Sequence, residues 1–266
     1  MIILFHLLKG YCKTMGILIN TSKNFFNYRH MSNIQVMHYL LRNSGLPSEN
    51  ILIFQREDPF MDPRNIFKDK VFLSEDISIP HYQMPPSKIS EHFILNIFYL
   101  RHPLLYRLDS KDSLIFYMCG HAREQFFKVS DRYFIFKNDL MRAINPLSQR
   151  VSKILLILDT CQASSLIDDD GIPPNVCVIS TSSTIEFSYS HSNVSLLGVS
   201  SIDEVMFTMY RKGIDGTVLI CEYFEGFNDG TLKSTVKCHG NRSFKFSDFI
   251  GNSNEDMSNS ISEFVL

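Results

Sequence analysis

KILLILDTCQA, residues 153–163, is an apolar run that ends in an acid and a cysteine. Five consecutive branched aliphatic residues, 154–158, are typical of a strand buried on both faces, as in a parallel sheet covered by helices. Cys161 comes after this strand, so we expect its side chain at the edge of the sheet and not in the core.

A second apolar run, SLIFYM at residues 113–118, is followed directly by Cys119, Gly120 and His121. In open α/β sheets, ligand clefts lie outside the carboxyl ends of the strands. We therefore expect Cys161 and His121 to face one crevice. A thiol beside an imidazole favours nucleophilic catalysis, although a cysteine in an apolar strand is more often a small core residue.

Two further features favour catalysis at Cys161. A helix beginning after Gln162 would lower the pKa of the thiol and supply backbone N–H donors for an oxyanion. Gly120 has no side chain, so the backbone beside His121 can approach a substrate closely.

The start of the chain follows a β-α-β pattern. Residues 16–22 are predicted to form a strand, 24–30 a loop, 31–43 a helix and 50–54 a second strand. Prolines scattered over residues 55–85 favour a long irregular excursion outside the core, serving as a lid or a partner surface. Beyond it we expect helices at 87–99, 138–144 and 197–211, a hairpin at 126–136, and a strand at 176–181.

This pattern divides the chain into four segments. Residues 1–15 are a degenerate secretory signal or a first strand, and 16–212 form the α/β domain. Residues 213–251, richer in Gly, Ser and Asn, are expected to form a small β-rich appendage, and 252–266 a disordered tail.

Composition excludes some classes of function. A formal net charge of -2 over 266 residues gives no electrostatic reason to expect nucleic acid as a partner. The six cysteines include no Cys-x-x-Cys pair, so we expect no metal site, and a core of this size needs no disulfide scaffold. No apolar run is long enough to span a bilayer.

Several motifs resemble those of one peptidase family. CGH at 119–121, LDTCQ at 158–162 and NYRHMSN at 27–33 are similar to segments of the legumain-type, caspase-like cysteine peptidases, and most of all to the catalytic subunits of GPI-anchor transamidases. The shorter matches, in the family's order, are GLP at 45–47, DPRN at 62–65, PNV at 174–176, SYSH at 188–191 and FSDFIG at 246–251. The resemblance covers about residues 16–212.

The resemblance implies a caspase-like, mostly parallel sheet with helices on both faces, and it implies a role for four residues. Cys161 matches the nucleophile, His121 the general base and acid, and Gly120, with the Cys161 amide, the oxyanion hole. Asn27 matches an asparagine that the family keeps near the histidine. No cofactor is implied.

Five more residues are candidate substrate contacts, and each has an ordinary structural alternative: Arg29 and His30 beside Asn27, Asp159, which would otherwise orient the catalytic loop, and Ser182 and Ser183, which match a substrate-lining segment of the family. The first two also suit the start of a helix, Asp159 suits a strand-end cap, and serines are common at strand ends. A departure from the family is Ala122-Arg123, which stands where the family has two glycines.

The implied activity is transamidation in the lumen of the endoplasmic reticulum. A C-terminal signal peptide is released from a proprotein, and the acyl group passes to the ethanolamine amine of a GPI glycolipid. The implied partners are the other, membrane-embedded transamidase subunits. Two alternatives remain open: a legumain-like asparaginyl endopeptidase, and a caspase-like scaffold without catalysis, which the Ala122-Arg123 change favours.

Overall fold

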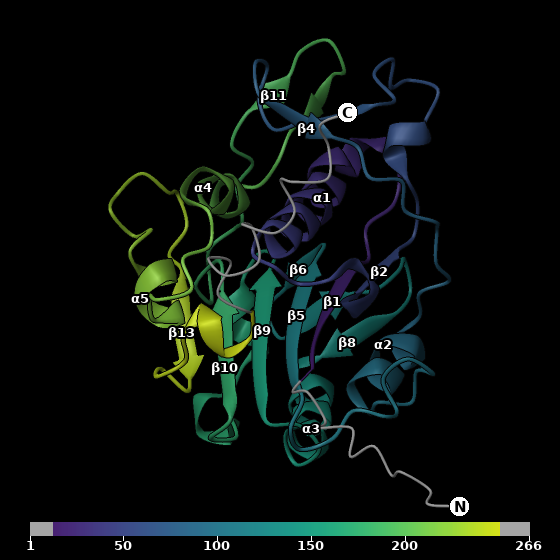
Figure 1. Cartoon of the computed structure of the whole chain (residues 1–266). Helices are drawn as coiled ribbons and strands as arrows, with labels where there is room; N and C mark the ends of the chain where they lie inside the picture. Colours follow the sequence, from purple (N-terminus) through teal and green to yellow (C-terminus); the bar gives the residue numbers. More distant parts are fainter. Residues whose placement is uncertain (1–12, 251–266) are drawn as a thin grey trace, which may run out of the picture.

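The computed structural model describes residues 13–250, which are built around a six-stranded sheet with the order β13-β10-β9-β5-β1-β2. Figure 1 shows this sheet from β13 on the left to β2 on the right. Its strands are β1 (Thr14–Asn20), β2 (Ile51–Gln55), β5 (Ser113–Cys119), β9 (Lys153–Asp159), β10 (Val176–Ser180) and β13 (Lys237–Gly240). All neighbours are parallel except β13, which runs antiparallel to β10.

Helices cover both faces of the sheet because its central strands are apolar on both sides. On one face, Tyr117 and Ile157 pack in a core shared with α1 (Tyr28–Asn43), α4 (Glu204–Lys212) and α5 (Ile220–Glu225). On the other, Phe116 and Leu156 pack with α2 (Glu91–Phe98) and α3 (Lys137–Ser148). The expected α/β class and the two apolar strands are confirmed.

Short elements complete the described residues. The small strands are β3 (Lys70–Phe72), β4 (Ser78–Pro80), β6 (Ala122–Arg123), β7 (Phe126–Lys128), β8 (Phe134–Phe136), β11 (Asn193–Val194) and β12 (Val199–Ser200). The 3-10 helices are η1 (Phe25–Asn27), η2 (Ser48–Asn50), η3 (Pro59–Met61), η4 (Ala163–Leu166), η5 (Asp169–Gly171) and η6 (Phe246–Asp248). The predicted hairpin at 126–136 corresponds to the pair β7–β8.

Several predicted boundaries differ from the structure. The first helix begins at Tyr28, so much of the expected loop 24–30 is helical. The predicted helix 197–211 begins only at Glu204, because residues 193–200 form the β11–β12 hairpin. Residues 55–85 are irregular, as expected, but they belong to the core: Phe60, Val71 and Leu73 are fully buried with α1. Their apolar side chains lie between the prolines and outweigh the prolines in deciding where the segment packs.

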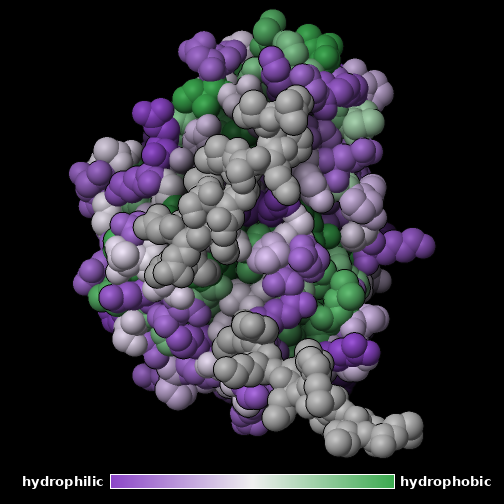
Figure 2. Space-filling view, in the orientation of Figure 1, coloured by the Kyte–Doolittle hydropathy of each residue, from purple (hydrophilic) through white to green (hydrophobic). Residues whose placement is uncertain are grey.

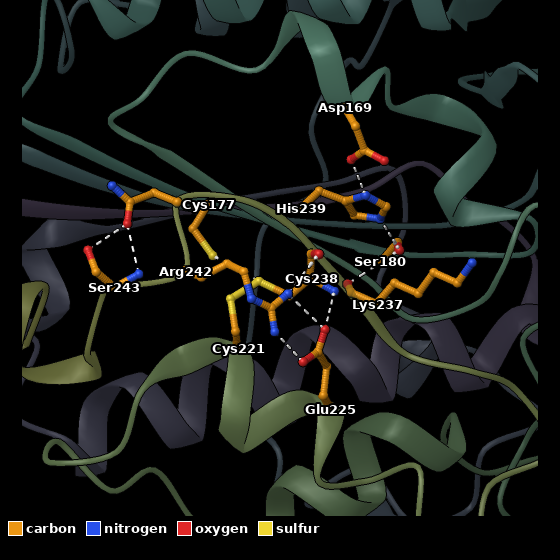
Figure 3. The surroundings of a disulfide bond; sticks show 11 residues. Asp169, Cys177, Ser180, Cys221, Glu225, Lys237, Cys238, His239, Arg242 and Ser243 are labelled. Atoms are coloured by element: carbon orange, nitrogen blue, oxygen red, sulfur yellow. Dashed lines mark hydrogen bonds and ion pairs between the residues drawn. A yellow bond between two sulfur atoms is a disulfide. The ribbon is translucent and has the colours of Figure 1, made fainter.

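The expectation of a separate β-rich unit at 213–251 is wrong for the described residues. Its apolar segment forms α5, and its single strand, β13, completes the main sheet. A disulfide between Cys221 and Cys238 ties α5 to β13, as Figure 3 shows. Of the expected N-terminal segment, Thr14 and Met15 begin β1; residues 1–12 and the expected tail at 252–266 lie outside the described residues.

The third sulfur near this disulfide belongs to Cys177 of β10, 3.8 Å from the Cys238 sulfur. Within residues 13–250 these three cysteines form the one group of His, Cys, Asp or Glu ligand atoms close enough to share a metal ion. Two of the three sulfurs are bonded to each other, which removes them as thiolate ligands.

The surface in view in Figure 2 mixes hydrophilic and hydrophobic residues, and hydrophobic ones gather near the β11–β12 hairpin, where Leu196 is 73% exposed. Across residues 13–250, the helices all fall short of the length and apolar character needed to cross a bilayer.

Candidate active site

Strand register brings the cysteine and histidine loops to the same edge of the sheet. Cys119 of β5 pairs with Asp159 of β9, and each loop residue of interest follows its strand by two positions. The hydroxyl of Thr160 donates a hydrogen bond of 2.8 Å to the carbonyl oxygen of Gly120, which ties the two loops together. His121 and Cys161 therefore leave the sheet side by side at the carboxyl ends of neighbouring parallel strands.

Asn27 fixes the His121 ring. The Oδ1 atom of Asn27 lies 2.8 Å from His121 Nε2, while its Nδ2 atom donates to the carbonyl oxygen of Lys23 over 2.6 Å. Because the amide nitrogen is used on Lys23, the amide oxygen must accept from His121, and Nε2 carries the proton. The Nδ1 lone pair is then available as a base. Asn27 precedes α1 but makes no side-chain cap there.

The His121 imidazole is held in its neutral form. Burial lowers its pKa, and the positive charges of Arg29 and Lys128 lower it further. The neighbouring ring of His30, 4.9 Å away between centroids, adds no charge, because burial lowers the His30 pKa well below its ordinary value. A neutral imidazole is the form that accepts a proton from a thiol.

Cys161 is partly exposed, unlike Cys119 and Cys177, which are buried. Its sulfur accepts a hydrogen bond of 3.4 Å from the backbone N–H of Ser188. The expectation of a helix after Cys161 is wrong. Gln162 adopts the left-handed conformation, with φ 51°, and the 3-10 turn η4 follows it instead. The groups that interact with the Cys161 sulfur are therefore the Ser188 N–H and, through its charge, Arg29, and not the first turn of a helix.

Gly120 is a glycine for a packing reason. Its φ is 151°, and a Cβ added there would lie 2.4 Å from the hydroxyl oxygen of Thr21. Any side chain would push the end of β5 away from β1. A role of its N–H as an oxyanion donor stays a prediction.

A buried polar network lies beneath the two loops. Arg29 Nη1 donates to Asp203 Oδ1 over 2.5 Å, and the Asn33 amide donates to Asp203 at 2.6 Å and to Asp159 at 3.2 Å. Burial raises the pKa of Asp159 to about 7, and the nearby Asp203 carboxylate adds to this. Tyr117 donates its hydroxyl proton to Asp159 over 2.5 Å. Asp159 is fully buried, which fits support of the Cys161 turn better than substrate contact.

The other candidate residues divide between surface and interior. Ser182 is fully buried and braces the cysteine turn: its hydroxyl accepts from the Ala163 N–H at 2.9 Å and donates to the Thr160 carbonyl at 2.8 Å. His30 is buried and hydrogen-bonds Ser22 at 2.7 Å. Ser183 is partly exposed and its N–H donates to Glu186.

The sequence motifs assign no role to three residues of the site: Asn33, Ser188 and Asp203. Asn33 lies in the matched motif at 27–33 and Ser188 in the one at 188–191, so the motifs themselves pointed to these two residues. Asp203 directly precedes α4, where an acid usually caps a helix, yet its carboxylate is turned toward Arg29 and Asn33. Only the fold reveals that contact, since 174 positions separate Asp203 from Arg29.

The chain is similar to known proteins both in sequence and in fold. No family model matches the chain. The chain is 29% identical over 241 residues to the GPI-anchor transamidase of Saccharomyces cerevisiae, covering 83% of this chain and 58% of that protein. It is 30% identical over 207 residues to the enzyme of that name from Schizosaccharomyces pombe, covering 73% of this chain and 54% of that one.

The human GPI-anchor transamidase is 26% identical over 224 residues, covering 74% of this chain and 53% of the human protein. The chain thus spans just over half the length of the curated relatives it matches. Among solved structures, caspase-1 from Spodoptera frugiperda superposes with a TM-score of 0.52 at 10% identity, covering 86% of this chain and 89% of that one. The chain has a caspase-like fold and is a relative of the GPI-anchor transamidases.

Proposed function

We propose that this chain is a cysteine-dependent transamidase, which cleaves the C-terminal GPI-attachment signal of a proprotein and transfers the acyl group to the ethanolamine amine of a GPI glycolipid. The observation that supports this most is the position of two loops that follow the paired residues Cys119 and Asp159. The loop after β9 carries Cys161, and the loop after β5 carries His121, which Asn27 holds in place. The likeness to GPI-anchor transamidases supports the choice of substrates.

The reaction runs in two halves. His121 Nδ1 takes the Cys161 thiol proton, the sulfur attacks the peptide carbonyl carbon, and the C–N bond breaks as His121 protonates the leaving amine. The product is a thioester on Cys161. In the second half the glycolipid amine attacks that carbon and gives a proton to His121, a new C–N bond forms, and the C–S bond breaks. The N–H groups of Cys161 and Gly120 would stabilise the oxyanion.

The proposal extends to place and partners. We expect the chain to work in the lumen of the endoplasmic reticulum, within a complex whose other subunits supply the membrane attachment. Arg29, beside the cysteine loop, and Ser183 are the candidate residues with the exposure needed to contact the proprotein.

The test is complementation. Cells lacking their own transamidase catalytic subunit should regain surface GPI-anchored proteins with the wild-type chain, and should not regain them with Cys161→Ala or His121→Ala expressed at equal levels. Restoration by Cys161→Ala would refute the catalytic role. For purified complex, conversion of a donor peptide to hydrolysed product alone, in the presence of an amine acceptor, would favour an endopeptidase instead.

A further inference from the structure

A pocket of about 100 Å³ opens beside His121, on the side of Asn27. Three cationic side chains line it together with one carboxylate: Lys23, Arg56, Lys128 and Asp131. Its wall is polar, with hydroxyls from the β1 and β7 ends. Neither Cys161 nor Arg29 lines it, so it is distinct from the region where the cysteine loop meets Arg29.

We propose that this pocket binds a phosphate group carried by the acceptor amine, and so presents that amine to the thioester beside His121. The proposal rests on the transamidase function proposed above, and it adds a residue-level binding site for the second substrate.

Charge is the first argument. Three cations against one carboxylate leave a formal net charge of +2 in the pocket. Asp131 bridges two of the cations, at 2.9 Å from Lys23 Nζ and 3.6 Å from Lys128 Nζ. Arg56 Nη1 donates a hydrogen bond of 2.9 Å to the Val129 carbonyl oxygen, which holds the guanidinium in the lining of the pocket. Arginine and lysine together are the usual donors to phosphate oxygens.

Position is the second argument. The amine that resolves a thioester must give up a proton near His121, and His121 itself forms part of the pocket wall. In phosphoethanolamine two carbons and one oxygen separate nitrogen from phosphorus, a span of roughly 5 Å when extended. Because Nε2 is engaged with Asn27, the amine proton must pass to Nδ1, and a phosphate held by the three cations leaves the ethanolamine arm to extend past the ring toward that atom. The electrostatic influence of Lys128 on the His121 pKa agrees with this closeness.

The transfer step then balances within the site. The amine nitrogen attacks the thioester carbon and its proton passes to His121. The C–N bond forms, the C–S bond breaks, and the sulfur leaves as the Cys161 thiolate, which recovers the proton from His121. The phosphate is unchanged, so its role is to position the amine.

Binding tests the pocket directly. The full chain with Cys161→Ala is titrated calorimetrically with O-phosphoethanolamine, ethanolamine and inorganic phosphate. We expect O-phosphoethanolamine to bind, ethanolamine to bind at least tenfold more weakly, and Arg56→Gln with Lys128→Gln to raise the dissociation constant at least tenfold. Arg142→Gln, an exposed change on α3, should leave it unchanged. Equal binding by the double variant would overturn the proposal.

The other arms separate the sources of phosphate. Inorganic phosphate binding as tightly as O-phosphoethanolamine would show a general anion site and refute an acceptor site. Because either substitution could disturb folding, Lys23→Gln is a second variant, and each protein is checked by its unfolding midpoint.

A kinetic test uses the assembled complex. The ratio of amide product to hydrolysed product should fall at least tenfold in Arg56→Gln when O-phosphoethanolamine is the acceptor, and much less with ethanolamine. An unchanged ratio would contradict the inference. Alkylation of Cys161 in the wild-type chain reports the proposed function separately. Weak labelling with intact O-phosphoethanolamine binding would refute the transamidase function, and strong labelling without O-phosphoethanolamine binding would refute the pocket alone.

Discussion

The Nε2 atom of His121 donates a hydrogen bond to Oδ1 of Asn27 over 2.8 Å, and Asn27 is fixed in turn by Lys23. Replacing Asn27 by alanine frees the ring to rotate and to change tautomer. We expect a 10- to 100-fold fall in the rate of acyl transfer, because small displacements of a catalytic group cost about this much. Asn27→Asp keeps an acceptor oxygen and should lose less.

The matched control for Asn27→Ala is Asn138→Ala, an exposed change on α3 that should leave the rate unaltered. A wild-type rate in Asn27→Ala would show that packing alone orients His121.

The thiols should differ sharply in reactivity. Iodoacetamide should modify Cys161 first, because burial raises the Cys119 pKa well above its ordinary value and the Cys177 pKa to about 12. Labelling followed by peptide mass mapping measures this. His121→Ala should slow modification of Cys161 by at least tenfold, and equal rates in both proteins would favour a scaffold without catalysis.

Acid should switch off cleavage of the donor peptide at a pH below 6.5. The reaction needs neutral His121, whose pKa is lowered by burial, Arg29 and Lys128, so activity persists until the pH falls to that lowered value. Lys128→Gln removes one of these positive charges and should move the acidic limb of the pH–rate profile upward. An acidic limb at the same pH in Lys128→Gln and in the wild type would mean that the charge of Lys128 does not lower the His121 pKa.

Tyr117→Phe should destabilise the protein in a pH-dependent way. Burial first, and then Asp203, raises the folded-state pKa of Asp159 from 3.8 to about 7, so its contribution to stability is present below pH 3.8 and is lost as the pH rises through about 7. The Tyr117 hydroxyl favours the ionised carboxylate. Its removal should cost about 1–3 kcal/mol at pH 8 and less at pH 5, measured by urea unfolding. A loss independent of pH would contradict this.

Reduction of the Cys221–Cys238 disulfide should lower the free energy of unfolding. The bond closes a loop with a sequence separation of 17, for which chain entropy gives about 3 kcal/mol. Urea unfolding with and without dithiothreitol measures the change. Cys177→Ala should remain sensitive to the reductant, whereas Cys221→Ser should not. An equal free energy of unfolding of the wild-type protein with and without dithiothreitol would show that the disulfide contributes little to stability.

Sequence patterns were reliable where one physical effect dominated. The runs at 114–118 and 154–158 are hydrophobic throughout, which favours strands covered on both sides, and the ends of such strands carry the reactive residues to one edge. The same reasoning failed at Cys161, where we expected a helix. The turn there is fixed by Ser182 and Glu186, whose contacts come from a later part of the chain.

The C-terminal segment was misjudged for a related reason. Its Gly, Ser and Asn content suggested a separate unit, but the strand that contains Cys238 pairs with β10, and a disulfide holds α5 against it. Pairing between distant segments leaves no local mark on composition. The same holds for Asp203, whose partners lie on α1.

The place of β13 in the sheet has a consequence for synthesis of the chain. Every residue of β10 is buried in the finished protein, and one of its edges is paired only by residues that follow it by about 60 positions. At 5–20 residues per second a ribosome takes roughly 3 to 12 seconds to make that stretch. For that interval the nascent sheet presents an open apolar edge, which is a site for chaperones or for aggregation. Truncations that stop short of Lys237 should therefore accumulate in insoluble form.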